Sequence, residues 1–283
     1  MVRFGPGGNS LSFYNEGHKS TIEAPKWLYK KGLSLYEYEC GQGVRISKDT
    51  AKKFGEEAKK YDIEVTVHAP YFISLASLEE QKRKNSINYI LQTLEACKNM
   101  GGKKIVVHPG GCSDRDREEA YLLAEKTMEE AVQAAYDNGY EDMIICPETM
   151  GKINQIGTVD EIIRMCKLDK ILIPTVDFGH INAREMGSLK TEEDYDRIIY
   201  KMIEELGIEK VKNLHIHFSK VEYTKGGEKR HLTFSDTVYG PEFPPLAKVL
   251  KKYKLEPTIV CESDGTMAED AVIMKEVFTN EDK

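Results

Sequence analysis

Eight short apolar and β-branched runs alternate with long amphipathic segments, and this alternation limits the folds open to the chain. The runs are nearly continuous in apolar residues, which is typical of parallel strands covered on both faces. The expected strands are residues 2–5, 33–38, 64–68, 104–108, 142–148, 171–177, 213–217 and 258–262. The expected helices are residues 49–61, 78–100, 115–138, 159–166, 192–206, 245–253 and 268–278. Eight strands separated by helices favour an α/β fold that closes into a (β/α)₈ barrel.

No low-complexity linker and no shift in composition marks a domain boundary in the 283 residues. Barrels of this kind run to roughly 250 residues as one unit, so we expect one TIM-barrel domain over residues 1–283. A doubly wound open sheet is the alternative, but it usually carries a glycine-rich phosphate turn after its first strand. Gly5-Pro6-Gly7-Gly8 opens no helical pattern and is better explained as a loop. Thr158 and Glu161 predict a capping box at one helix start.

The net charge of −7 argues against a lysine-coated binder of polyanions, although the sum would hide a basic rim around an acidic pocket. Six cysteines without a CxxC pair indicate reduced thiols. No basic region followed by an apolar run opens the chain, and no apolar stretch is long enough to cross a bilayer. We therefore expect a cytoplasmic protein without a membrane partner.

Six successive expected strands, the third to the eighth, deliver a histidine or a carboxylate at or near their carboxyl ends. The side chains are His68, His108, Glu148, Asp177, His215 and Glu262. These ends meet at one face of a barrel, where (β/α)₈ enzymes place their active sites. Imidazole and carboxylate together suit zinc, manganese or iron, and the lack of a cysteine cluster argues against a structural zinc site. The pattern predicts a site for several divalent metal ions.

Each of these residues also has an ordinary explanation, because a histidine or carboxylate after a strand often caps a helix or accepts a hydrogen bond. Those explanations would have to place all six on one face independently, so metal binding is the better account. His180 follows Asp177 closely in Asp-Phe-Gly-His, and His231 lies in the long loop after the seventh strand. His217 points to the same side of its strand as His215, two residues away. His18 is interpreted as a surface residue.

The ordered set of motifs resembles the endonuclease IV family of apurinic/apyrimidinic (AP) endonucleases, within the xylose-isomerase-like barrels. The resemblance covers nearly the whole chain. It is carried by His68-Ala-Pro-Tyr-Phe-Ile-Ser-Leu, Val107-His-Pro-Gly, Pro147-Glu-Thr, Asp177-Phe-Gly-His, Leu214-His-Ile-His-Phe-Ser-Lys, Lys229-Arg-His and Cys261-Glu-Ser.

The resemblance implies zinc ions in the barrel mouth, two or three in number, with manganese or iron as alternatives. The implied ligands are His68, His108 and Glu148 for the first ion, Glu148, Asp177, His215 and Glu262 for the second, and His180 and His231 for the third. The family usually has an aspartate two residues before the second histidine of its third site. Here that position is Lys229, and the adjacent Glu228 is the candidate to substitute for the aspartate.

The resemblance also implies the reaction, which is cleavage of the phosphodiester 5′ to an abasic site in DNA, with Glu148 as the catalytic carboxylate. Tyr71 and Phe72 fall where the family enters the DNA and holds the gap open, although ordinary packing at a loop base is an equal explanation. Arg45 would stand in for an arginine of the DNA-recognition loop. We expect a monomer that binds DNA containing abasic sites.

A sugar isomerase or epimerase of the same superfamily is the alternative function. Such enzymes typically need one metal ion. The equivalents of its ligands here are Glu148, Asp177, His215 and Glu262. The remaining histidines, which a one-metal enzyme has little reason to keep, are His68, His108, His180 and His231. They favour the nuclease. A third hypothesis is a non-catalytic relative that binds damaged DNA or a partner, motivated by Lys229 and the acidic net charge.

Overall fold

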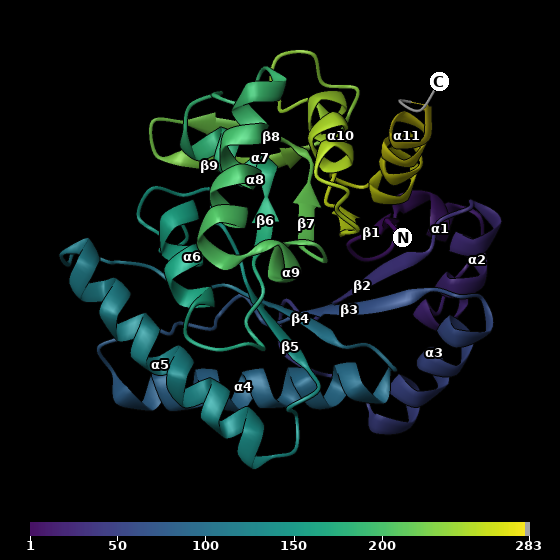
Figure 1. Cartoon of the computed structure of the whole chain (residues 1–283). Coiled ribbons are helices and arrows are strands. Elements are labelled where there is room, and N and C mark those ends of the chain that lie inside the picture. Colours follow the sequence, from purple (N-terminus) through teal and green to yellow (C-terminus); the bar gives the residue numbers. More distant parts are fainter. Residues whose placement is uncertain (281–283) are drawn as a thin grey trace.

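Eight parallel strands form a closed ring at the centre of the molecule, and helices cover its outside (Figure 1). The structure is a computed structural model, and it describes residues 1–280. The ring strands are β1 Arg3–Pro6, β2 Leu35–Glu39, β3 Glu64–His68, β4 Lys104–Val107, β5 Ile144–Pro147, β6 Thr175–Asp177, β7 His215–Phe218 and β10 Thr258–Cys261.

Two four-stranded parallel sheets, β1-β10-β7-β6 and β2-β3-β4-β5, make up the ring. They are joined on one side by a parallel bridge between Gly7 and Glu37. On the other side, Ile145 pairs with Leu172 and Glu148 pairs with Thr175, again in parallel. The ring therefore has no open edge, which confirms the expected barrel and excludes the open doubly wound sheet.

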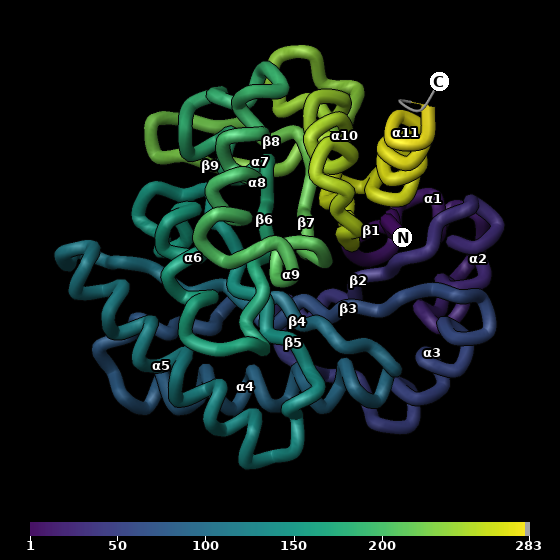
Figure 2. The backbone as a smooth tube through the Cα atoms, viewed as in Figure 1, coloured from purple at the N-terminus to yellow at the C-terminus, as the bar shows by residue number. Residues whose placement is uncertain are grey.

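The seven helices expected from the sequence are all present, and shorter ones lie before and between them. The helices are α1 Leu11–Asn15, α2 Ala24–Lys30, α3 Lys48–Lys60, α4 Glu80–Asn99, α5 Arg117–Asp137, α6 Val159–Cys166, α7 Phe178–Arg184, α8 Glu192–Leu206, α9 Ile208–Val211, α10 Phe243–Lys252 and α11 Met267–Asn280. A short 3₁₀ turn, Thr21–Glu23, precedes α2. The capping box of Thr158 and Glu161 at the start of α6 is confirmed. Helix α11 packs beside β1, so the last described helix lies next to the first strand (Figure 2). The rings of Phe4 and Phe278 are 5.7 Å apart.

Several short elements were not expected from the sequence. The short helices α1 and α2 fill the connection between β1 and β2. Helix α7 begins directly after β6, where Asp177 accepts a hydrogen bond from the backbone N–H of His180 at 2.7 Å. The expected loop after β7 is a hairpin of β8 Lys220–Thr224 and β9 Gly227–Leu232, at the upper left of Figure 1.

Strand β6 is shorter than the expected residues 171–177, because only Thr175–Asp177 keep a regular ladder. Pro174 has no backbone N–H to donate, so the ladder is interrupted there. The six cysteines are buried and free, which agrees with the expected reduced thiols. Within residues 1–280, no helix has both the length and the apolar character needed to cross a membrane.

Candidate metal centre

A cavity of about 370 Å³ opens at the carboxyl ends of the ring strands. It is lined by His68, Tyr71, His108, Glu148, Met150, Lys152, Gln155, His180, Glu228, His231 and Glu262. The strand ends, the loops after β3 and β5, α7 and the β8–β9 hairpin deliver these side chains. Six of the predicted residues thus line one cavity: His68, His108, Glu148, His180, His231 and Glu262.

The first ligand set consists of His68, His108 and Glu148. The Oε2 atom of Glu148 lies 2.8 Å from Nε2 of His108 and 3.4 Å from Nε2 of His68. The Nδ1 atom of His68 lies 2.8 Å from the carbonyl oxygen of Ala69, to which it can only donate. The Nε2 lone pair of His68 is therefore free to face a cation.

The second ligand set consists of Glu148, Asp177, His217 and Glu262. The Nδ1 atom of His217 lies 3.1 Å from Oε1 of Glu148 and 3.3 Å from Oε1 of Glu262. Glu148 thus belongs to both sets, with Oε2 turned to the first and Oε1 to the second. One carboxylate in this position can bridge two adjacent metal ions.

His215, the histidine predicted for the second set, lies one step deeper in the barrel. Its Nε2 atom lies 2.8 Å from Oε2 of Glu37, and its Nδ1 atom lies 2.7 Å from Oγ1 of Thr258. His215 and His217 both face inward, and two residues of strand span about 6.6 Å, so the one nearer the carboxyl end of β7 reaches the mouth. That residue is His217.

The third ligand set consists of His180, His231 and Glu228, whose carboxylate takes the place of the aspartate that the family has at position 229. Oε2 of Glu228 lies 3.4 Å from Nε2 of His180, and Oε1 lies 4.0 Å from Nε2 of His231. Lys229 does not face the set, because its Nζ atom lies 2.6 Å from Glu222 on the exposed side of the hairpin. The pairs Glu222–Arg230 and Tyr223–Glu228 leave Lys229 as the extra residue of a β-bulge. The bulge puts Glu228 and His231 on one side.

The cluster has an excess of buried negative charge. Burial raises the pKa of Asp177 to about 8 and, together with the nearby Glu37 and Glu262 carboxylates, raises the pKa of Glu39 to about 7. Burial opposes protonation of the histidines, but the surrounding carboxylates raise the pKa of His68 to about 10 and of His180 to about 9. Without bound metal ions, these groups therefore hold protons near neutral pH, and the protons reduce the negative charge of the cluster.

Divalent metal ions fit the cluster. Oε2 of Glu148 and Oδ2 of Asp177 are buried and make no hydrogen bond of regular geometry to any residue from 1 to 280. A buried carboxylate oxygen without such a partner is costly, and a cation removes the cost. The Nδ1 atom of His180 also lies 3.0 Å from the carbonyl oxygen of Thr149, which leaves its Nε2 for a cation.

Tyr71, Phe72 and Arg45 are all exposed, in the loops beside the mouth. Tyr71 is 55% exposed, its ring lies 5.1 Å from that of His68, and its hydroxyl donates to Oε2 of Glu39 at 3.1 Å. Phe72 is 50% exposed and contacts Tyr89 edge-on, with ring centres 4.7 Å apart. Tyr71 lines the cavity, whereas Phe72 stands farther out on the rim.

Sequence reasoning missed two residues of β2, Glu37 and Glu39. Their side chains lie within reach of Glu262 and form another candidate group of ligands. The signal was present, since two carboxylates alternate with tyrosines in a strand that is otherwise apolar. Alternation places both on the inner side of the barrel.

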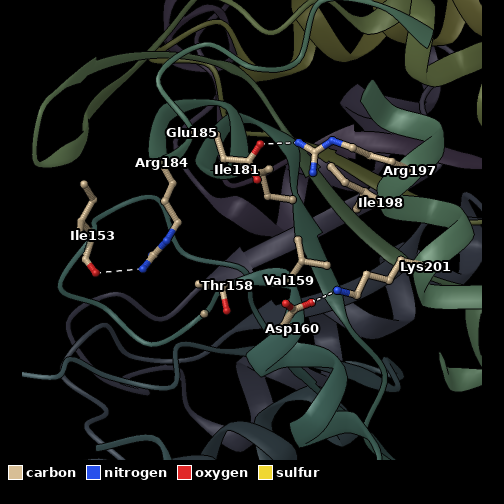
Figure 3. Close-up of a pocket in the computed structure, with 11 residues that line it drawn as sticks. Ile153, Thr158, Val159, Asp160, Ile181, Arg184, Glu185, Arg197, Ile198 and Lys201 are labelled. Atoms are coloured by element: carbon tan, nitrogen blue, oxygen red, sulfur yellow. Dashed lines mark hydrogen bonds and ion pairs between the residues drawn. The ribbon is translucent and has the colours of Figure 1, made fainter. Parts of the chain in front are cut away.

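A second cavity of about 460 Å³ lies outside the ring, among α6, α7 and α8 (Figure 3). Its positively charged side chains have partners in the protein. Arg197 pairs with Glu185, and Lys201 pairs with Asp160. Arg184 donates to backbone carbonyls, among them that of Ile153 at 2.9 Å. The charges in this cavity are thus neutralised internally, unlike those at the barrel mouth.

The chain is similar to several known proteins. It is 33% identical over 275 residues to an uncharacterised protein of Methanocaldococcus jannaschii, an alignment that covers 97% of this chain and 96% of that protein. It is 30% identical over 194 residues to a probable endonuclease 4 of Aquifex aeolicus, with 66% of each chain covered.

Solved structures of two kinds share the fold. A D-tagatose 3-epimerase-like protein superimposes with a TM-score of 0.69 at 24% identity, covering 88% of each chain. Endonuclease IV from Thermus thermophilus gives a TM-score of 0.66 at 16% identity, covering 93% of this chain and 96% of that one. The sequence pattern of the family described as "Xylose isomerase-like TIM barrel" matches residues 26–277. With endonuclease 4 proteins among its relatives, as the motifs indicated, the chain belongs to the xylose isomerase-like TIM barrel family.

Proposed function

We propose that the protein is a metal-dependent AP endonuclease, which hydrolyses the DNA phosphodiester 5′ to an abasic site. The observation that carries the proposal is the position of Glu148, whose two oxygens face two adjacent ligand sets, with a third set beside them. Three neighbouring cation sites suit the attack on a phosphate, where charge develops on several oxygens. Imidazole and carboxylate ligands suit zinc, with manganese or iron as alternatives.

Each ligand set would have its own cation. The first ion would be held by His68, His108 and Glu148, the second by Glu148, Asp177, His217 and Glu262, and the third by His180, Glu228 and His231. When bound, such ions supply positive charge and make water a stronger acid near neutral pH.

The protein's own residues orient the substrate. Lys152 lines the cavity and offers a positive charge to a phosphate. Tyr71 and Phe72 present exposed rings at the rim, where each can stack on a base beside the abasic gap. Arg45 adds positive charge in the exposed loop after β2. These contacts would place the phosphodiester over the ligand sets.

Epimerisation of a sugar is the second candidate, because Glu148, Asp177, His217 and Glu262 form a complete one-metal site by themselves. The D-tagatose 3-epimerase-like structure has the same fold. The other two ligand sets favour the nuclease, since a one-metal reaction leaves them without a purpose.

Metal content and activity, measured on one preparation, test the proposal. We expect two or three ions per chain and cleavage of duplex DNA that carries one abasic analogue, with activity lost after prolonged chelation. Matched duplex without the analogue is the control, and it should stay intact. One tightly bound ion per chain, together with epimerisation of a ketose and no cleavage, would instead establish the sugar enzyme.

A further inference from the structure

Glu37 lies in β2 beneath the second ligand set and is completely buried. Its Oε2 atom accepts a hydrogen bond from Oγ1 of Thr66 at 2.6 Å and lies 2.8 Å from Nε2 of His215. Its Oε1 atom lies 2.8 Å from Nε2 of His217, at an angle outside the regular hydrogen-bond range. One buried carboxylate thus faces both histidines of β7.

The ring of His215 lies between Glu37 and Thr258. A carboxylate can only accept, so Nε2 of His215 carries a proton and donates it to Oε2 of Glu37 at 2.8 Å. The Nδ1 atom of His215 lies 2.7 Å from Oγ1 of Thr258, which also accepts a hydrogen bond from the ammonium group of Lys104 at 3.0 Å.

The proton on His217 follows from the same carboxylate. Nε2 of His217 lies 2.8 Å from Oε1 of Glu37 and 3.2 Å from Nε2 of His215, and the acceptor-only carboxylate favours a proton on this nitrogen. The other nitrogen, Nδ1, faces Glu148 at 3.1 Å and Glu262 at 3.3 Å. A neutral imidazole protonated at Nε2 has its lone pair on Nδ1, directed at the second ligand set.

We propose that Glu37 is a positioning residue that fixes the tautomer of His217, so that Nδ1 of His217 binds a divalent cation. Hydrogen bonds from Thr66 and His215 hold Glu37 in the required arrangement, which gives the deeper histidine of β7 its role. The inference rests on the metal-binding part of the proposed function and not on the reaction. Carboxylates that orient metal-binding histidines are common, and their loss costs about 10–100-fold in metal affinity.

Glu37→Gln is the variant that tests the inference, because it keeps the shape of the side chain. A glutamine has one acceptor oxygen, so its NH₂ group must face the N–H of either His215 or His217. If the NH₂ group faces His217, the neutral ring must carry its proton on Nδ1 and direct Nδ1–H at the cation; if the oxygen faces His217, the ring still loses its charged partner. We expect weaker metal binding in both arrangements. Asp270→Asn is the matched control, since Asp270 is a buried carboxylate in α11 that accepts from the backbone of Phe234.

Co²⁺ alone is the probe. Metal-free full-length protein and both variants are titrated with Co²⁺ in competition with a chelator, and the visible absorption of the bound ion is recorded. In Glu37→Gln we expect one ion to bind about 10–100-fold more weakly, with a changed absorption spectrum. Asp270→Asn should bind as the unaltered protein does. Equal affinity and spectrum in Glu37→Gln would overturn the inference.

Nitrogen NMR of the histidine rings gives a test that needs no variant to fold. In the unaltered protein loaded with zinc, His217 should be protonated at Nε2 and not at Nδ1. The opposite pattern would overturn the inference even if DNA cleavage is confirmed. If the protein bound metal and oriented His217 as described but did not cut abasic DNA, only the proposed reaction would fail.

Discussion

Glu148 has two oxygens that serve different ligand sets, and this division makes it the most sensitive residue of the cluster. Burial would raise the pKa of its carboxyl, but His217 and His108 hold the pKa well below the ordinary range. Glu148 is therefore ionised across the neutral range and is ready to bind cations on both sides.

Replacing Glu148 by glutamine should remove one negative charge from two sites at once. We expect cleavage of abasic DNA to fall by more than about 100-fold, since loss of a residue that merely orients a ligand already costs about 10–100-fold. Metal content should fall as well. Glu141→Gln, at an exposed carboxylate near the same strand, is the control for general effects of charge. Activity within a few-fold of the unaltered enzyme would exclude Glu148 as the bridging ligand.

Tyr71 should help to bind DNA and take no part in the hydrolysis, because it lines the cavity but belongs to no ligand set. Tyr71→Ala should weaken binding of a duplex with an abasic analogue by about 1–3 kcal/mol, the usual contribution of a stacked aromatic ring. Tyr71→Phe keeps the ring and loses only the hydrogen bond to Glu39, so it should bind nearly normally. Fluorescence anisotropy measures both. Equal losses in the two variants would point to the hydroxyl instead.

The β8–β9 hairpin is the element that completes the third ligand set. Its bulge at Lys229 turns Glu228 toward His180 and directs Lys229 outward to Glu222. In a regular strand Lys229 would lie on the same side as His231, because side chains alternate. The one extra residue of the bulge places Glu228 there instead.

Glu228→Gln and Lys229→Gln separate the two residues. The Glu228 variant should lose one bound ion per chain and most of its activity, because the third set would have only two histidines. The Lys229 variant should keep its full metal content. Metal analysis after gel filtration measures both, and an unchanged ion count in the Glu228 variant would contradict the third site.

The turn of the same hairpin depends on Gly227. Its φ of +89° is unfavourable for other residues, and a Cβ there would lie 2.1 Å from the carbonyl oxygen of Gly151. Gly227→Ala should therefore reduce the free energy of unfolding by at least about 1–2 kcal/mol, the cost of left-handed backbone alone. At the neighbouring Gly226 a Cβ meets nothing nearer than 3.7 Å, so Gly226→Ala should cost little. Denaturant titration compares the two, and equal losses would refute the steric argument.

At the scale of the whole molecule, the barrel and most of its mouth follow from periodicity alone. Parallel strands bring their carboxyl ends to one face, so residues far apart in the chain, such as His68 and Glu262, can be grouped by their positions in the expected strands. How near a residue lies to the barrel mouth was harder to predict. His215 and His217 both point inward, so alternation alone could not decide which of them belongs to the second ligand set. The alternation in β2 indicates that Glu37 points into the barrel, but its role depends on contacts with Thr66 of β3 and His215 of β7, which no local pattern contains.

The collected buried carboxylates make the stability of the metal-free protein depend on pH. His68 and His180 have pKa values raised to about 10 and about 9, and Asp177 has one raised to about 8. All three exceed the values of the unfolded chain, so the folded state binds more protons between pH 7 and 10. Stability supported by these histidines is complete below pH 6.5 and is lost as the pH rises through 9 to 10.

We therefore expect the melting temperature of the chelated protein to fall as the pH rises from 7 to 9. The metal-loaded protein should melt higher throughout and change less, because cations take the place of those protons and binding to the folded state stabilises it. Comparing the two forms at each pH removes the contribution of groups outside the cluster, such as the buried cysteines. Parallel curves for the two forms would mean that the cluster does not exchange protons for metal ions.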